Sequence, residues 1–383
     1  MPSIPLPQTD SEHGTHALVI GVSRYPYADG DEATDFGEQS GLENLSSAAR
    51  SASEFAAWLL KEYHNPEAEL KSLHVLLSPA DGEVIHPEIE ALLPAPYAAT
   101  RAAVRGELIS FREMCRKQED VGIVYVAGHG VQLSKRGAIV LLEDFAAEGQ
   151  MDRLEGAIDM VGCHAGMNGN EYAAHQYWFV DACRQRPAYA RKFESMTGAL
   201  TFGDEPNGQV HSAPLFLASS TRESAFAERG GTSLFSRAVL AALRGDGARG
   251  PDEGPGDEWT VPVSRLVELL NDSVQALAGE HGEEQRVDIT GRVNEAVIHR
   301  FREQPDVHLQ LSMEPGPAAA STTIELLLDG NSPVDPPPSE WPIDQRVPAG
   351  LYQLKVQFHD HYNNVSTLLN IKPLEYRANV EVT

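Results

Sequence analysis

Apolar residues follow two spacings along the first three hundred positions. Short continuous apolar runs, typical of buried strands, alternate with segments whose apolar residues recur every three or four positions, as on one face of a helix. The alternation predicts an α/β fold with a mostly parallel sheet sandwiched by helices. The predicted strands lie at 16–22, 73–77, 122–127, 139–142, 177–185 and 214–218, and the predicted helices at 45–63, 104–115, 151–164, 232–244 and 263–277.

The hydrophobic period changes to two from about residue 305 onward. Short alternating strands between turns rich in Pro and Gly predict a small antiparallel β-sandwich. We therefore expect two domains, at 14–302 and 305–383. Three segments within the first domain lack a regular pattern and are expected to be loops: 24–41, 184–212 and 245–258.

The charge of the chain is strongly unbalanced, with 30 basic and 56 acidic residues and a net charge of −26. Such a surface repels nucleic acid and anionic membranes and attracts basic partners, although it also serves solubility alone. The three cysteines show no disulfide framework, and the N-terminus lacks the pattern of a signal peptide. No apolar run approaches the roughly 20 residues that span a bilayer. We expect a cytoplasmic protein.

Two residues with catalytic potential stand at the ends of predicted apolar strands. His129 follows 122–127 within Gly-His-Gly, and Cys183 ends the second run, 54 positions later (183 − 129). The carboxyl ends of strands are where open α/β sheets build their sites. A thiolate is a nucleophile, and an imidazole can take its proton and pass it on. The alternative interpretation is a buried small apolar Cys and an ordinary loop His.

The two other cysteines are weaker candidates. Cys163 lies in Gly-Cys-His-Ala-Gly, but this segment follows a helix-like stretch and comes only 34 positions after His129 (163 − 129). Cys115 lies on an apolar helical face and is predicted to be part of the core.

These motifs together resemble the caspase/metacaspase clan of cysteine peptidases in its bacterial form. The similarity extends over about residues 14–302, and the C-terminal strands are similar to the immunoglobulin-like modules attached to bacterial enzymes. The matching segments are His16 to Val22, Gly-His-Gly at 128–130, Asp-Ala-Cys-Arg at 181–184, Ala218-Ser219-Ser220 with Glu223 and Glu228, and Ser233-Leu234-Phe235-Ser236.

The resemblance implies a role for each matched residue. Cys183 corresponds to the nucleophile and His129 to the general acid/base, and the backbone N–H groups of Gly130 and Cys183 correspond to the oxyanion hole. Asp181 stands where metacaspases carry an Asp that pairs with Arg or Lys and where caspases carry Gln. A carboxylate there would bind the guanidinium fork and repel Asp. Alternatively, Asp181 caps the following turn.

Two charged segments are further candidates. The acidic loop at 24–41 offers Asp29, Asp31 and Asp35 as additional carboxylates for a basic substrate. The basic stretch after Cys183 lies where the clan is often cut during activation, and it offers Arg184, Arg186, Arg191 and Lys192 as self-cleavage sites unless it is merely a solvated loop.

No cofactor is expected, because the chain has neither a Gly-rich phosphate loop nor zinc-type Cys/His spacing. No metal is expected either. The acids Asp252, Glu253, Asp257 and Glu258 lack the spacing of a calcium loop.

We therefore expect a cysteine endopeptidase that acts after Arg or Lys in protein or peptide substrates. By analogy with bacterial relatives, it would be a regulated effector in a stress or antiviral response, switched on by a protein or a small nucleotide signal. Two alternatives stay open: a catalytically silent scaffold or signal-binding module, and an acyl-enzyme hydrolase for non-peptide substrates.

Overall fold

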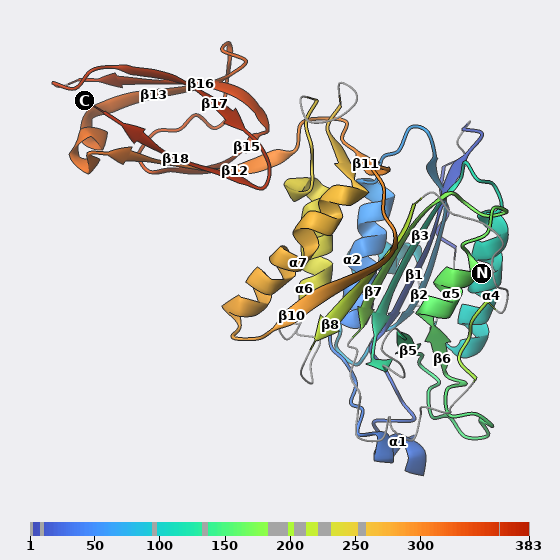
Figure 1. Ribbon diagram of the computed structural model, residues 1–383. Coiled ribbons are helices and arrows are strands. Elements are labelled where there is room, and N and C mark those ends of the chain that lie inside the picture. Colours follow the sequence, from blue (N-terminus) through green and yellow to red (C-terminus); the bar gives the residue numbers. More distant parts are fainter. Residues whose placement is uncertain are drawn as a thin grey trace. The chain divides into compact units, whose positions relative to one another are not determined.

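The structure is a computed structural model of the whole chain (Figure 1). It describes residues 3–7, 11–93, 98–131, 137–182, 198–202, 212–220, 231–251, 258–359 and 361–382. The chain forms two compact units. The first comprises Met1–Leu240 with Leu266–Ile298, and the second comprises Ala241–Arg265 with His299–Thr383.

The first unit is built on a six-stranded sheet with the order β10-β8-β7-β3-β1-β2. Five neighbouring strands, from β8 to β2 in this order, run parallel to one another. Only the edge strand β10 is antiparallel to its neighbour, β8. The strands are β1 (Gly14–Val22), β2 (Glu69–Ser78), β3 (Val121–Gly128), β7 (His175–Ala182), β8 (Ala213–Ser220) and β10 (Gln285–Arg292). The expected mostly parallel sheet is confirmed.

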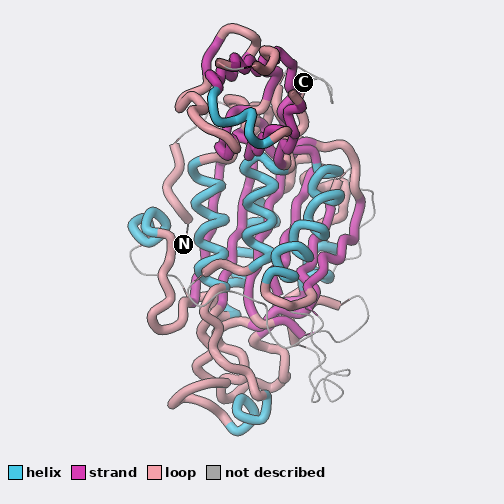
Figure 2. The backbone as a smooth tube through the Cα atoms, turned by 90° about the vertical axis from the view of Figure 1, so that its left-hand side faces the viewer, coloured by secondary structure: helices cyan, strands magenta, loops and turns pink. Residues whose placement is uncertain are grey.

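Helices cover both faces of this sheet (Figure 1). One face carries α2 (Ala48–Lys61), α6 (Leu234–Ala241) and α7 (Val263–Glu280), and Figure 2 looks onto these helices. The other face carries α4 (Arg101–Met114) and α5 (Met160–Gly166). Both interfaces are apolar, because successive side chains of a strand point to opposite faces and both sets are buried here.

The segment 151–164, expected to be one helix, is divided. It contains turns, a short strand β6 (Ala157–Asp159) and the first part of α5. Asp159 ends the strand and caps the helix, because its Oδ1 accepts a hydrogen bond of 3.0 Å from the Gly162 N–H. The backbone of β6 is held from outside the segment: Leu200 N–H donates to Ala157 O, and Asp159 N–H donates to Leu200 O. These long-range bonds override the local helical pattern.

The acidic loop at 24–41 is also more regular than expected, since it ends in the short helix α1 (Asp35–Ser40). Thr34 caps it by accepting from the Gly37 N–H at 3.0 Å, and Gly41 ends it with a φ of 64°. The strand predicted at 139–142 is confirmed as β5 (Ile139–Leu141), and it pairs with the short strand β4 (Gly130–Val131). The remaining elements are α3 (Pro87–Leu92), a π-helical turn (Ala242–Asp246), and the pair β9 (Thr260–Pro262) with β11 (Val297–Arg300).

The C-terminal strands form two packed sheets, as expected for a β-sandwich. One sheet has the order β15-β12-β18 and the other has the order β14-β13-β16-β17. Most pairs are antiparallel, while β18 runs parallel to β12. The strands are β12 (Asp306–Glu314), β13 (Thr322–Leu328), β14 (Ser332–Pro333), β15 (Ile343–Pro348), β16 (Gly350–Phe358), β17 (Val365–Ile371) and β18 (Glu375–Glu381), with a 3-10 helix at Gly316–Ser321.

Inward-facing residues of both C-terminal sheets share one core, in which Leu309, Leu311, Tyr352, Leu354 and Val356 are almost completely buried. The alternation that predicted these strands is therefore the alternation between this core and solvent. Among the described residues of the chain, no helix has the length and apolar character to cross a bilayer.

Candidate active site

His129 lies directly after β3, at the carboxyl edge of the parallel sheet. β3 pairs with β7 in a register that places Gly128 beside Ala182. The residue after Gly128 is His129, and the residue after Ala182 is Cys183. Cys183 itself lies outside the described residues. The topology therefore brings the two chain positions that lead into His129 and Cys183 to the same edge of adjacent strands.

The imidazole of His129 is held by a backbone carbonyl. Its Nε2 lies 2.7 Å from the carbonyl oxygen of Glu43. A carbonyl oxygen only accepts, so Nε2 carries the hydrogen and Nδ1 of the neutral ring is left as an acceptor. Burial lowers the pKa of His129 and is the largest influence, while the Glu43 carbonyl and carboxylate partly raise it. The neutral, proton-accepting form is thus favoured near neutral pH.

Tyr25 fixes the backbone and the ring of His129. Its hydroxyl oxygen accepts from the His129 N–H at 2.8 Å, and the two rings lie 4.9 Å apart in a tilted arrangement. Tyr25 is completely buried, and burial raises the pKa of its hydroxyl group, which therefore stays protonated. The glycine at 128 makes room for this contact, since a Cβ there would lie 2.9 Å from the Tyr25 hydroxyl oxygen.

The Gly130 N–H points away from the neighbouring strand. The Leu141 N–H donates to the His129 carbonyl at 2.8 Å, and Gly130 pairs with Val140. Hydrogen-bonded and non-hydrogen-bonded pairs alternate along antiparallel strands, so the Gly130–Val140 pair is of the second kind. Its N–H faces away from β5, as a donor to a substrate oxygen would.

Asp181 is a buried carboxylate on β7, with 4% of its surface exposed. Its Oδ2 accepts from the Tyr125 hydroxyl at 2.8 Å and from the Ser233 hydroxyl. Its Oδ1 is buried and has no hydrogen-bond partner among the described residues. Burial raises the pKa of Asp181 to about 6, and the two hydroxyl donors partly counteract it.

Ser233 was not predicted as a site residue. It precedes α6, and its Oγ also accepts from the Ser236 N–H at 3.0 Å, which is an N-cap contact. In the sequence, the position of Ser233 just before a helical pattern indicates only the start of a helix. It does not indicate a contact with Asp181. The contact with Asp181 joins residues 52 positions apart, and only the tertiary structure brings them together.

The three acids of the loop at 24–41 differ in their surroundings. Asp29 is partly buried, and its Oδ2 accepts from the Asn44 N–H at 2.9 Å, directly beside the carbonyl that holds His129. Asp31 is exposed on the loop, and Asp35 is exposed in the first turn of α1. Glu43 and Asn44 had not been predicted as site residues, because a backbone carbonyl leaves no signature in the sequence.

The two described cysteines are core residues, as predicted for Cys115, whereas Cys163, expected at the end of a helix, lies inside α5. Cys115 and Cys163 have no exposed surface, and burial raises the pKa of both thiols. Nearby carboxylates, Asp120 for Cys115 and Asp159 for Cys163, act in the same direction. Both thiols are inaccessible, and their raised pKa keeps them protonated, so neither is a candidate nucleophile.

Several predicted residues lie outside the described residues. They are Cys183 and the candidate cleavage sites Arg184, Arg186, Arg191 and Lys192, together with Glu223, Glu228, Asp252, Glu253 and Asp257. Glu258, the described member of the acidic group near 252, pairs with Arg300 at 3.5 Å.

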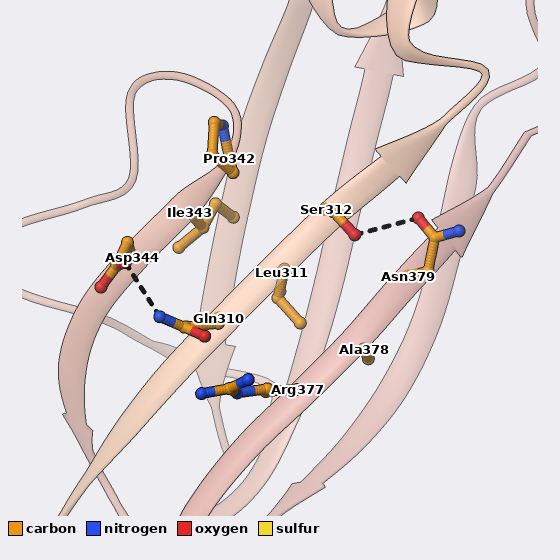
Figure 3. Close-up of a pocket in the computed structure, with 9 residues that line it drawn as sticks. All are labelled: Gln310, Leu311, Ser312, Pro342, Ile343, Asp344, Arg377, Ala378 and Asn379. Carbon is orange, nitrogen blue, oxygen red and sulfur yellow. Dashed lines mark hydrogen bonds between the residues drawn. The ribbon is translucent and has the colours of Figure 1, made fainter. Parts of the chain in front are cut away.

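A hollow of about 500 Å³ is present on the C-terminal unit, between β12, β15 and β18 (Figure 3). Its polar side chains bond to one another: Gln310 donates to Asp344 at 3.0 Å, and Ser312 donates to Asn379 at 3.1 Å. None of the predicted site residues lines it.

The parallel sheet, the order of its strands and the His at the end of β3 define a caspase-like protein. The family model described as "Caspase domain" matches residues 15–305. The chain therefore belongs to the caspase domain family, which is a family of cysteine peptidases. No curated protein matches the chain.

Proposed function

We propose that this protein is a cysteine endopeptidase that cleaves after Arg or Lys, with Cys183 as nucleophile and His129 as general acid/base. The observation that carries the proposal is the register of β3 with β7, in which Gly128 pairs with Ala182. Neighbouring strands lie about 4.8 Å apart. Residues that follow a matched pair therefore start within side-chain reach of each other.

The proposed reaction begins with transfer of the Cys183 thiol proton to Nδ1 of His129. The thiolate attacks the scissile carbonyl carbon, and the resulting oxyanion accepts hydrogen bonds from the N–H groups of Gly130 and Cys183. The imidazolium then gives its proton to the departing amine, which leaves a thioester. Water, deprotonated by His129, attacks the thioester, releases the carboxylic acid and restores the thiol.

The hydrogen bond to Glu43 suits this role of His129. Because the Glu43 carbonyl occupies Nε2–H, the tautomer with a proton-accepting Nδ1 is the favoured one. The same bond keeps the ring oriented when it becomes charged. The lowered pKa of His129 keeps most molecules in the neutral, active form at neutral pH.

The preference for Arg or Lys rests on Asp181. Its Oδ1 is a buried acceptor without a partner among the described residues. Leaving such an atom unpaired is unfavourable by about 1–3 kcal/mol, and more for a charged group. A guanidinium or ammonium group from a substrate would satisfy it, whereas a substrate carboxylate would be repelled. Asp31 and Asp35 stay candidates for a second, exposed contact.

The test is hydrolysis of fluorogenic peptides that end in Arg, Lys or Asp by the wild type and by Cys183→Ala and His129→Gln. We expect cleavage after Arg and Lys that both substitutions abolish. Cleavage after Asp would contradict the role of Asp181. Cleavage that survives in Cys183→Ala would contradict the dyad. An iodoacetamide-labelled peptide map provides a second readout, in which Cys183 should react faster than the buried Cys115 and Cys163.

We further propose that the chain is cut after one of Arg184, Arg186, Arg191 and Lys192. The described residues on both sides of this stretch are anchored in the fold. On the N-terminal side, β7 extends to Ala182. On the C-terminal side, the backbone of Leu200 bonds to β6, and Arg101 donates to the Gly198 carbonyl at 2.5 Å. A cut between them would leave both new ends attached to the fold. Mass spectrometry of an active preparation should show a cut after one of these residues, and only intact chain after prolonged incubation would refute it.

The family resemblance also supports a role as a regulated effector in a stress or antiviral response. In this proposal, 14–302 is the peptidase domain and 305–383 is the accessory domain that receives an activating protein or a small nucleotide. The two sheets of the C-terminal β-sandwich carry none of the predicted catalytic residues, which is compatible with a regulatory role.

A further inference from the structure

The peptide group between Glu43 and Asn44 is bonded at both of its polar ends. Its carbonyl oxygen lies 2.7 Å from Nε2 of His129, and its N–H donates to Oδ2 of Asp29 at 2.9 Å. One rigid, planar amide therefore connects a carboxylate with the imidazole. The chain in order is Asp29 carboxylate, amide of 43–44, His129.

The same segment is tied to the fold by three further hydrogen bonds. The Asn44 side-chain oxygen accepts from the Tyr25 N–H at 2.6 Å, and the Asp29 N–H donates to the Tyr25 carbonyl at 2.9 Å. The Leu45 N–H donates to the Ser23 carbonyl at 2.8 Å. Tyr25 also accepts from the His129 N–H, so the loop that carries Asp29 and the strand end that carries His129 share one anchor.

We propose that Asp29 is a positioning residue for His129, acting through the 43–44 peptide group rather than through contact with substrate. The proposal rests on the proposed peptidase function and deepens it. A carboxylate that accepts from an amide N–H polarises the amide and makes its carbonyl oxygen a stronger acceptor, because hydrogen bonds in a chain strengthen one another. The carbonyl then holds the Nε2–H more firmly and stabilises the imidazolium formed during catalysis.

This arrangement assigns Asp29 a different task from a substrate-binding carboxylate. A residue that binds a basic side chain lowers KM for Arg and Lys substrates and leaves other substrates unaffected. A residue that orients His129 acts on kcat for every substrate, because proton transfer occurs in each turnover. The carboxylate of Glu43 also acts on His129 and is retained in every variant below.

The experiment compares Asp29→Asn, Asp29→Ala and, as a matched control, Glu32→Gln. Asn keeps an oxygen acceptor but loses the charge, and Ala loses both. Glu32 is an exposed carboxylate on the same loop, so its change alters the charge of the loop equally. We expect kcat to fall about tenfold in Asp29→Ala, which is the effect of one hydrogen bond to a charged group, and less in Asp29→Asn. KM should stay near its wild-type value in both Asp29 variants. In Glu32→Gln, both kcat and KM should stay near their wild-type values.

A second readout does not depend on turnover. Titration of the His129 ring by NMR, with its signal identified by its loss in His129→Gln, gives the pKa in each variant. We expect a lower His129 pKa in both Asp29 variants and no change in Glu32→Gln, because only Asp29 is coupled to the ring through the peptide group.

Two outcomes would overturn the proposal. One is an unchanged His129 pKa in Asp29→Ala. The other is a higher KM for Arg and Lys peptides at unchanged kcat, which would make Asp29 a substrate ligand. If the wild type cleaves no peptide, the proposed function fails, yet the NMR titration still decides whether Asp29 is coupled to His129.

Discussion

At the scale of single residues, burial acts on two ionisable groups at the same edge of the sheet and favours the neutral form of both. It lowers the pKa of His129 and raises that of Asp181 to about 6. For His129 the neutral form is the one that accepts a proton. For Asp181 the neutral form is the one that loses its attraction for a cation. Burial therefore favours the proposed role of His129 and opposes that of Asp181.

The first prediction concerns pH and substrate preference. Asp181 is ionised above about pH 6 and protonated below it. We therefore expect the preference for Arg over a neutral residue before the scissile bond to fall at least about tenfold as the pH drops from neutral through this pKa. The measurement is kcat/KM for the two peptides as a function of pH, which reports the free enzyme.

Asp181→Asn is the matched control for this pH dependence. Its amide is neutral at every pH, so the preference for Arg should be weak throughout and independent of pH. A preference that persists in Asp181→Asn, or that stays constant down to about pH 5 in the wild type, would contradict the assignment of Asp181.

The residues of the candidate site differ in how visible they are in the sequence. His129, Asp181 and Cys183 are predicted as site residues because polar side chains stand at the ends of apolar strands. Ser233 and the Glu43 carbonyl were not found. A hydroxyl that caps a helix is common, and a carbonyl is present in every residue, so neither leaves a pattern that sequence analysis can recognise.

At the scale of elements, β1 and α2 pack closely against each other. A Cβ on Gly21 would lie 2.6 Å from the Ala52 Cβ and 2.8 Å from the Ala48 carbonyl oxygen. The small residues of α2 and the glycine of β1 together allow the backbones to approach this closely. Ser23, two positions further on, accepts from the N–H groups of Ala48 and Ala49 at 3.0 Å and so holds the start of the helix.

The second prediction compares two Gly-to-Ala changes. Gly21→Ala should lower the free energy of unfolding by about 1–3 kcal/mol, because the added methyl group meets backbone atoms that have no room to move. Gly106→Ala should raise it by about 0.5–1 kcal/mol, since Gly106 is exposed inside α4 with open space around its Cα. Denaturant titration of both variants measures the difference, and equal effects would contradict the packing described here.

Two elements show where local sequence patterns fail. The helical pattern at 151–164 is interrupted by β6, whose backbone bonds to Leu200. The strand β10 was not expected, because only Val287 and Ile289 stand out among its polar residues. It is an edge strand that depends on antiparallel pairing with β8. In both cases the partners lie outside the segment itself: β5 and Leu200 for β6, and β8 for β10.

At the scale of the whole molecule, the net charge of −26 determines how charged ligands approach. Summed over the surface, an excess of one sign raises the rate at which oppositely charged molecules arrive. A peptidase specific for Arg or Lys would gain from this field, because its substrates carry positive charge at the cleavage site.

The third prediction is a salt dependence of substrate capture. Between roughly 0.01 M and 0.15 M salt the Debye length shrinks from about 30 Å to about 8 Å, so attraction at long range is screened. We expect kcat/KM for a basic peptide to fall over this range while kcat stays constant. A peptide with the same Arg but acidic flanking residues is the control and should show the opposite slope. The same slope for both peptides would exclude steering by the protein's charge.

The sequence by itself determined the class of fold. Apolar runs and helical spacings in alternation require a sheet covered on both faces, and a period of two after residue 305 requires strands with one buried face. These patterns are local, because each residue's environment follows from its neighbours within a turn or a strand. The sequence also predicted His129, Asp181 and Cys183 as candidate site residues at strand ends.

The tertiary structure decided which groups surround these residues. The Glu43 carbonyl on His129, the Asp29 carboxylate behind that peptide group, and Ser233 with Tyr125 on Asp181 all come from distant parts of the chain. Their contacts depend on strand register and helix packing. Register arises from the summed burial of a whole strand, so these contacts cannot be derived from any short segment.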